Sequence, residues 1–348
     1  MEEIVVGRAL LGQNLDPQPA RIVVEDGRIR SIEEDSLPGT EHLIVPAFFN
    51  AHTHLGDTVA MDLPLGDDLA AIVTPPHGLK HRILRGTPHR DLVAAMHASI
   101  RTMIASGTRG CVDFREGGEA GVRALKEASS NLPIHVVILG REGGERIADG
   151  LGVSSARDVL DLDALVHRAW TDQKLVAFHA GERDPGDIDR ALDYDPDLLV
   201  HCTHASAAHL RACADRDIPI AVCPRANWAF GVTSGPDHPP IREMLRQGCE
   251  VLLGTDNVMA VQPDILQEMS FFSRVYRIDP ITVLRSAVHG SVRFGRSHYL
   301  EEGNPARFLV VDTGDSNIRY TQNPIAAVVN RLHAGMIEAN VKTMGTKL

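Results

Sequence analysis

The sequence has no excess of basic residues. Its 348 residues include 35 Lys and Arg against 46 Asp and Glu, which gives a formal net charge of −11. A chain of this sign is not attracted to phosphate backbones or to anionic lipid surfaces. We therefore expect neither nucleic acid nor a membrane as a partner, and we expect the substrate to be a small molecule.

Long apolar runs are also missing, and we expect no secretory signal. No stretch approaches the roughly 18 apolar residues that a membrane-spanning helix needs. The first ten residues, MEEIVVGRAL, are acidic where a secretory signal is basic, and their apolar part is short. This pattern predicts a cytoplasmic protein.

Cysteine is sparse and is never spaced as CxxC. An odd number of unclustered cysteines is typical of reduced, buried thiols, and disfavours a disulfide framework or a zinc knuckle. The five are Cys111, Cys202, Cys213, Cys223 and Cys249. The 17 histidines are therefore the more informative residues.

Most of the chain alternates β-rich apolar runs with segments of helical apolar spacing. This alternation is typical of an α/β fold with a parallel sheet, and eight such runs predict a (β/α)8 TIM barrel. The runs are residues 43–51, 109–114, 134–139, 149–155, 175–180, 198–203, 219–224 and 250–255. The span 43–295 matches the roughly 250 residues of such a barrel, and we assign residues 43–303 to it.

The two ends of the chain predict a small β-domain. Residues 1–42 contain short apolar runs around Asp26-Gly27, a dipeptide typical of a hairpin turn. Residues 304–348 contain the runs ARFLVVD and IAAVVNRLHAGMIEANVKTMG, which we expect to form short strands that could pair with those of the N-terminus.

The first predicted barrel strand ends in two histidines, His52 and His54. Alternate residues of a strand point to one face, so both imidazoles would be directed at the barrel axis. Such a pair could share one metal ion, although a pair of hydrogen-bonded histidines at a strand end explains the spacing equally simply.

Further potential ligands follow the fifth, sixth and eighth strands, in residues 179–182, 201–204 and 254–256. All lie at the C-terminal ends of strands, the face on which barrel active sites are built. Three neutral imidazoles and one carboxylate suit Zn²⁺ and leave a coordination position for water. The predicted metal ligands are His52, His54, His179 and Asp256.

These motifs resemble those of the amidohydrolase superfamily, specifically its mononuclear branch of cytosine deaminases, adenosine-type deaminases and chlorohydrolases. The resemblance spans nearly the whole chain, including the split β-domain. It is carried by PAFFNAHTH (46–54), HAGE (179–182), HCTH (201–204), CPRAN (223–227) and GTD (254–256). The sequence departs from the family at Ala47, where Gly is usual, and in the return segment 302–307, both away from the expected metal.

The binuclear branch of that family bridges two metals with a carboxylated lysine on strand four. This chain has no lysine between Glu127 and Gln173. Lys174 precedes His179 by five residues, an odd offset that directs it away from the axis. The resemblance therefore implies one divalent metal per chain, Zn²⁺ or alternatively Fe²⁺.

Two residues beside the expected metal are candidates for catalysis. Glu182 is placed to carry a proton, as a non-ligand glutamate does in zinc deaminases of another fold; the alternative is a solvated loop carboxylate. The resemblance implies that His204 orients the attacking hydroxide or polarises the substrate, with His201 in a supporting position. Alternatively, His204 occupies a supporting position of the kind expected for His201.

The loop after strand seven offers groups for binding a substrate. Trp228 or Phe230 could stack on a planar ring, with ordinary loop packing as the alternative, and Arg225 could bind a carboxylate or phosphate. Other polar residues at strand ends could touch the substrate or lie in solvated loops: Asn227, Asn257, Asp57 and Arg115.

The expected reaction is hydrolytic deamination of an amino-substituted heterocycle such as a nucleobase, nucleoside or aminotriazine. Asp256 would accept a proton from a zinc-activated water, and Glu182 would protonate the ring nitrogen as ammonia leaves. Hydrolysis of a cyclic amide, a formimino group or a C–Cl bond by the same site is the alternative. A non-catalytic binding protein is disfavoured because every expected metal and proton-transfer position holds a competent side chain. A homo-oligomer is compatible with a barrel covered by helices.

Overall fold

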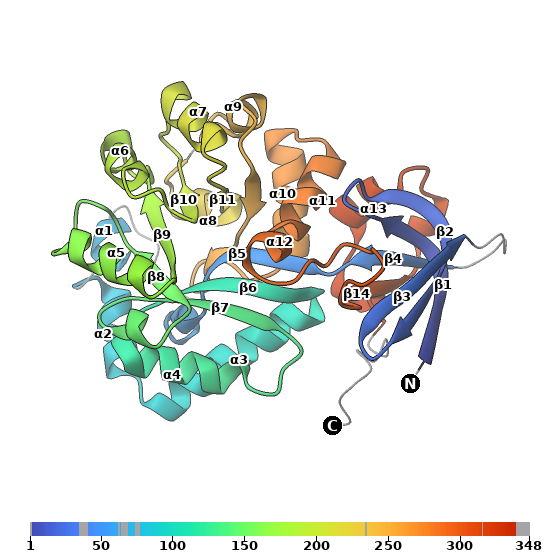
Figure 1. Ribbon diagram of the computed structural model, residues 1–348, viewed down its shortest axis with the longest axis horizontal. Helices are drawn as coiled ribbons and strands as arrows, with labels where there is room; N and C mark the ends of the chain where they lie inside the picture. Colours follow the sequence, from blue (N-terminus) through green and yellow to red (C-terminus); the bar gives the residue numbers. More distant parts are fainter. Residues whose placement is uncertain are drawn as a thin grey trace.

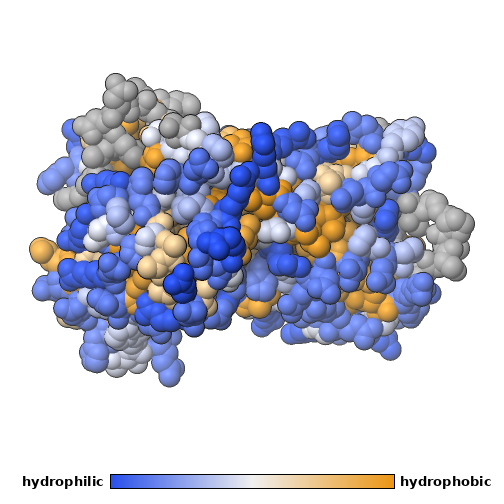
Figure 2. Space-filling model, turned by 90° about the horizontal axis from the view of Figure 1, so that it is seen from above, coloured by the Kyte–Doolittle hydropathy of each residue, from blue (hydrophilic) through white to orange (hydrophobic). Residues whose placement is uncertain are grey.

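The computed structural model describes residues 2–34, 41–61, 63, 69–73, 77–233, 235–314 and 316–338. Two sheets organise this part of the chain (Figure 1), a nine-stranded parallel sheet and a five-stranded mixed sheet. None of the helices in these residues is long and apolar enough to cross a membrane. Hydrophilic residues cover most of the face drawn in Figure 2, and hydrophobic residues gather near its middle.

The nine-stranded sheet closes into a barrel. Its strands are β5 (Phe48–His54), β6 (Thr108–Arg115), β7 (His135–Gly140), β8 (Gly150–Val153), β9 (Leu175–Ala180), β10 (Leu198–His201), β11 (Ile220–Val222), β12 (Val251–Leu253) and β13 (Asp256–Asn257). β12 pairs with β11, whereas β13 pairs with β5. β12 and β13 are therefore two pieces of one eighth strand, and the (β/α)8 prediction is confirmed.

Gly254 lies between these two pieces and allows them to approach β5. A Cβ atom at this position would lie 2.7 Å from the Cβ atom of His52 and 3.1 Å from the Sγ atom of Cys223. Only a residue without a side chain therefore brings Asp256 next to His52.

Helices surround the barrel and connect its strands (Figure 1). The α-helices are α1 (Leu69–Val73), α2 (Leu79–Gly86), α3 (His89–Ala105), α4 (Gly118–Ser129), α5 (Leu162–Thr171), α6 (Ile188–Leu192), α7 (Ala207–Asp215), α8 (Pro224–Ala229), α9 (Ile241–Arg246), α10 (Ile265–Tyr276), α11 (Pro280–Val288), α12 (Gly290–Phe294) and α13 (Pro324–Arg331). The 3-10 helices are η1 (Leu55–Ala60), η2 (Gly144–Arg146), η3 (Pro185–Asp187), η4 (Asn317–Tyr320) and η5 (Ala334–Met336). All five cysteines are reduced and buried, as expected.

The five-stranded sheet joins both ends of the chain in the order β14-β4-β1-β2-β3. Its strands are β1 (Glu2–Leu11), β2 (Asp16–Glu25), β3 (Arg28–Glu34), β4 (His42–Pro46) and β14 (Phe308–Asp312). Asp26 and Gly27, with φ of 50° and 73°, form the predicted two-residue turn between β2 and β3. The return strand ARFLVVD is also present as β14, paired with β4.

The boundary expected at residue 43 differs from the structure. Residues 43–46 belong to β4, which pairs with β1 and β14 rather than with the barrel strands. The chain passes between the sheets at Ala47, whose N–H donates to the carbonyl of Arg307. A continuous apolar run fits either sheet, so the run 43–51 alone could not indicate this crossing.

The expected strand at IAAVVN is wrong, because residues 324–331 form helix α13. The Asn323 side chain accepts a hydrogen bond from the Ala326 N–H, and Pro324 occupies the first helical position, both strong helix-starting features. Val328 and Val329 are buried where α13 packs against α10 and α11. The predicted continuation beyond residue 338 lies outside the described residues.

Candidate functional site

Three histidines meet at the C-terminal face of the barrel. His52 and His54 end β5, and His179 lies near the end of β9. Their ligand atoms all lie within 4.8 Å of one another, and the three side chains are buried. The ring of Phe114 contacts His52 and His179 edge-on, with centroid distances of 4.8 and 4.6 Å, and so supports both imidazoles.

Asp256 completes this cluster. Its Oδ1 atom lies 3.3 Å from Nε2 of His52 and 3.5 Å from Nε2 of His54. The structure therefore brings together all four residues that the sequence analysis selected as metal ligands.

Hydrogen bonds on the outer side of the histidines direct their inner nitrogens at one point. His54 Nδ1 lies 3.0 Å from Glu116 Oε1, and His179 Nδ1 lies 3.1 Å from the carbonyl of Val153. Both acceptors require a proton on Nδ1, so each Nε2 carries a lone pair. These two Nε2 atoms face each other at 3.3 Å. Both ring nitrogens of His52 are buried and have no hydrogen-bond partner among the described residues.

This arrangement fits a divalent metal ion. Two nitrogens about 2.05 Å from a tetrahedral zinc ion lie about 3.3 Å apart, which is the separation observed for His54 and His179. Burial lowers the pKa of His52 and of His179 well below the usual range and lowers the pKa of His54 to about 3. Neutral imidazoles are the form that binds metals, so His52, His54 and His179, with Asp256, could hold one ion.

His201, rather than His204, faces this cluster. His201 ends β10, is 1% exposed, and forms a second set of potential ligands with His52 and Asp256. The His204 ring lies beside that of His238, at a centroid distance of 5.5 Å. The placement expected from the sequence is therefore reversed.

The backbone explains this reversal. His201 and Cys202 have φ of 75° and 48°, so the chain turns at the strand end and the alternation of faces stops there. The sequence does not show these dihedral angles, and counting along HCTH could not decide which histidine points inward.

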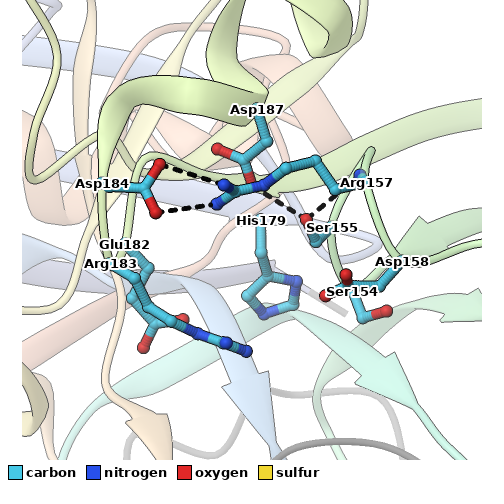
Figure 3. A pocket seen from close by; sticks show the side chains of 9 residues that line it. All are labelled: Ser154, Ser155, Arg157, Asp158, His179, Glu182, Arg183, Asp184 and Asp187. Atoms are coloured by element: carbon cyan, nitrogen blue, oxygen red, sulfur yellow. Dashed lines mark hydrogen bonds and ion pairs between the residues drawn. The ribbon is translucent and has the colours of Figure 1, made fainter.

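Glu182 lines a cavity of about 220 Å³ that reaches His179 (Figure 3). Its side chain is 28% exposed, and its Oε1 atom lies 3.9 Å from Nε2 of His201. Asp187 accepts hydrogen bonds from the Gly181 N–H at 2.8 Å and from Ser155 at 2.9 Å, which fixes the loop that carries Glu182. The other lining residues are Ser154, Arg157, Asp158, Arg183 and Asp184.

Arg225 is committed to helix α10. Its backbone N–H and its Nε atom donate to the two carboxylate oxygens of Glu268 at 2.9 and 2.7 Å. Its Nη1 donates to Gln267, and its Nη2 donates to the carbonyls of Gln262 and Asp264. This network disagrees with the expected role of Arg225 in gripping a substrate anion.

Trp228 and Asn227 also make internal contacts. Trp228 donates from Nε1 to the Tyr276 hydroxyl at 3.2 Å and packs edge-on against Phe271. Asn227 is buried and donates to Thr203 at 3.4 Å. Neither residue belongs to the lining of the cavity beside Glu182, so stacking of a substrate on Trp228 stays a prediction.

Two charged residues beside the histidines, Glu116 and Lys80, were not among those expected from the sequence. Glu116 directly follows β6, and the rule that selected the other strand-end residues would have found it. Lys80 lies in α2, within a long connection that has no motif. Asn257, Asp57 and Arg115 are buried with these two residues rather than solvated. Lys174, which was expected to point away from the barrel axis, donates to the carbonyls of Glu145 and Arg146.

Comparisons with known sequences agree with this arrangement. The profile of the Amidohydrolase family matches residues 43–148, and that of Adenosine deaminase matches residues 148–291. A putative aminohydrolase of Methanothermobacter thermautotrophicus is 34% identical over 93% of each chain. A 5-methylthioadenosine/S-adenosylhomocysteine deaminase of Pyrococcus horikoshii is 23% identical over 95% of this chain and 91% of its own.

Solved structures share the fold at low sequence identity. Atrazine chlorohydrolase from Arthrobacter aurescens, complexed with zinc, superposes with a TM-score of 0.77 at 16% identity over 94% of this chain and 93% of its own. Guanine deaminase from C. acetobutylicum superposes with a TM-score of 0.75 at 15% identity over 97% of each chain. These structures share the fold, and the 34% identical relative, together with the profile matches, shows that the chain belongs to the amidohydrolase family.

Proposed function

We propose that this hydrolase is a zinc-dependent deaminase that releases ammonia from an amino-substituted heterocycle. The observation that carries the proposal is the convergence of His52, His54, His179 and Asp256 beside a cavity lined by Glu182. A water bound to zinc has a pKa of about 7, which would supply a hydroxide nucleophile at neutral pH.

The residues of this chain would hold and move the protons. Asp256, next to the inward nitrogens of His52 and His54, would accept the proton of the attacking water. Glu182, on the wall of the cavity, would donate a proton to the ring nitrogen beside the reacting carbon. His201 takes the role that the sequence suggested for His204, polarising the substrate or orienting the water, because His201 is the histidine that faces Asp256 and His52.

The relatives favour deamination over other reactions of this family. The names of several include a deaminase, such as the Pyrococcus horikoshii protein, and the Adenosine deaminase profile covers the segment that carries His179, Glu182 and Asp256. The alternative is hydrolysis of a C–Cl bond, a formimino group or a cyclic amide by the same site, since activation of water does not select the leaving group.

A screen for ammonia release tests this proposal. Zinc-loaded protein is incubated with aminopurines, aminopyrimidines and aminotriazines, and in parallel with chlorinated rings, formimino compounds and ring amides. We expect ammonia from at least one amino-substituted ring, loss of that activity after chelation, and its return with added zinc. Turnover of a chlorinated ring, a formimino compound or a ring amide without any ammonia from the amino-substituted rings would replace deamination by the alternative.

A further inference from the structure

A buried lysine connects two sides of the proposed metal site. Lys80 is 2% exposed, and its ammonium group donates to Asp57 Oδ2 at 2.9 Å, to Glu116 Oε1 at 3.2 Å and to Asn257 Oδ1 at 3.2 Å. The three acceptors follow or end three different barrel strands, β5, β6 and β13. Lys80 thus holds helix α2 against the C-terminal face of the barrel.

One arm of this network reaches His54 through Glu116. The Oε1 atom that accepts from Lys80 also lies 3.0 Å from Nδ1 of His54. Oε2 of Glu116 accepts from Arg115 at 2.6 Å, and Arg141 also pairs with this carboxylate. The Glu116 carboxylate thus pairs with three cationic side chains, Lys80, Arg115 and Arg141. Its hydrogen bond with His54 places the imidazole proton on Nδ1 and leaves the lone pair on Nε2.

The other arm reaches Asp256 through Asn257. An ammonium group can only donate, so the amide oxygen of Asn257 must face Lys80. The amide nitrogen then faces Asp256 and donates to Oδ1 at 2.8 Å. The side-chain amide of Asn257 thus links the position of the Lys80 ammonium group to that of the Asp256 carboxylate.

Lys80 is not suited to other roles at the site. Its three N–H bonds are matched by three acceptors, which leaves none for a substrate. A carboxylated lysine, such as the one that bridges two metals in the binuclear branch, would be negative and would face the carboxylates of Asp57 and Glu116. The contacts therefore require the ammonium form.

We infer that Lys80 is a positioning residue that, through Glu116 and Asn257, fixes His54 and Asp256 in the geometry that binds the metal. The inference rests on the proposed function for the presence of that metal. Metal affinity and turnover then both depend on Lys80 in helix α2, although Lys80 itself touches neither metal nor substrate.

Zinc affinity of Lys80→Met, measured by competition with a chromophoric chelator, tests this inference. Groups that orient metal ligands typically change metal affinity or activity by 10- to 100-fold, and we expect a loss of about that size. Lys174→Met is the matched control, because Lys174 donates to two backbone carbonyls, those of Glu145 and Arg146. We expect its zinc affinity to equal that of the wild type.

Lys80→Met removes the ammonium group that pairs with the buried carboxylates of Asp57 and Glu116 and can prevent folding, although Glu116 keeps Arg115 and Arg141. Asn257→Ala is the second variant, because it breaks one arm while Lys80 keeps Asp57 and Glu116. We expect weaker zinc binding and a lower kcat with little change in KM, while the thermal unfolding of the metal-free protein stays close to that of the wild type. Where both variants fold, the effect of Asn257→Ala on zinc affinity should be smaller in the Lys80→Met background than alone.

Zinc affinity and kcat within twofold of the wild type in Asn257→Ala and in a folded Lys80→Met would overturn the inference and leave the proposed function intact. A wild-type protein that binds no zinc would instead contradict the proposed function, and this inference with it.

Discussion

The ion pair between Arg225 and Glu268 should stabilise the fold rather than bind substrate. Glu268 is 0% exposed, and both of its carboxylate oxygens accept hydrogen bonds from Arg225. Arg225→Met leaves only the backbone N–H as a donor from this residue. Removing one partner of a buried ion pair typically costs about 3–5 kcal/mol. We expect a loss of this size in the free energy of unfolding.

The loss should depend on pH. Burial raises the pKa of Glu268 even with Arg225 present to lower it, and removal of the guanidinium group should raise the pKa further. When a carboxyl group has a higher pKa in the folded protein than in the unfolded chain, the folded protein loses stability as the pH rises from the unfolded pKa through the folded pKa. Arg225→Met should therefore be more destabilising at pH 8 than at pH 5.5.

Urea unfolding followed by circular dichroism measures both effects. Arg246→Met is the control, because Arg246 is 69% exposed and pairs with Glu243 on the surface of α9; it should cost less than about 1 kcal/mol. Arg225→Met/Glu268→Leu should recover much of the lost stability, because no charge is left buried. If Arg225→Met lost less than about 1 kcal/mol but raised KM strongly, Arg225 would be a substrate ligand and this reasoning would be wrong.

Three further predictions concern catalysis and pH. Glu182→Gln cannot donate and recover a proton, so kcat should fall by roughly 10²- to 10⁴-fold while zinc is retained; near-normal turnover would remove Glu182 from the mechanism. His201→Asn should lower kcat far more than His204→Asn, and steady-state kinetics showing the opposite order would restore His204. Burial lowers the pKa of His298 from 6.5 to about 3. Between these two pH values the imidazole of His298 is protonated in the unfolded chain but not in the folded protein. His298→Gln should therefore reduce the loss of stability on acidification by about 1.4 kcal/mol per pH unit, and urea midpoints with unchanged pH dependence would contradict this.

Features set by local periodicity could be predicted from the sequence. The βα alternation predicted the barrel, and the alternation of faces along β5 placed His52 and His54 together. The barrel rule for strand ends then selected His179 and Asp256, because parallel strands present their C-terminal ends on one face. These residues could be selected without knowledge of the loop conformations.

Features set by tertiary contacts or by unusual dihedral angles could not be predicted from the sequence. The inward position of His201 depends on the left-handed backbone at the end of β10. Helix α13 is a different case: its apolar residues fit a strand as well as a helix, but Asn323 and Pro324 are local helix-starting signals that were present in the sequence. Lys80 lies in a long connection that carries no recognisable motif, and its role emerges only where three strand ends converge on its ammonium group.

The most direct test of a metal-activated water at this site is to measure zinc content and ammonia release on the same preparations of wild type and His179→Ala. His179 supplies one of the two Nε2 atoms that face each other at 3.3 Å, so its removal should release the metal and abolish ammonia release together. We expect about one zinc per wild-type chain and far less in the variant. Equal zinc content in the two proteins, or undiminished ammonia release without zinc, would contradict the account.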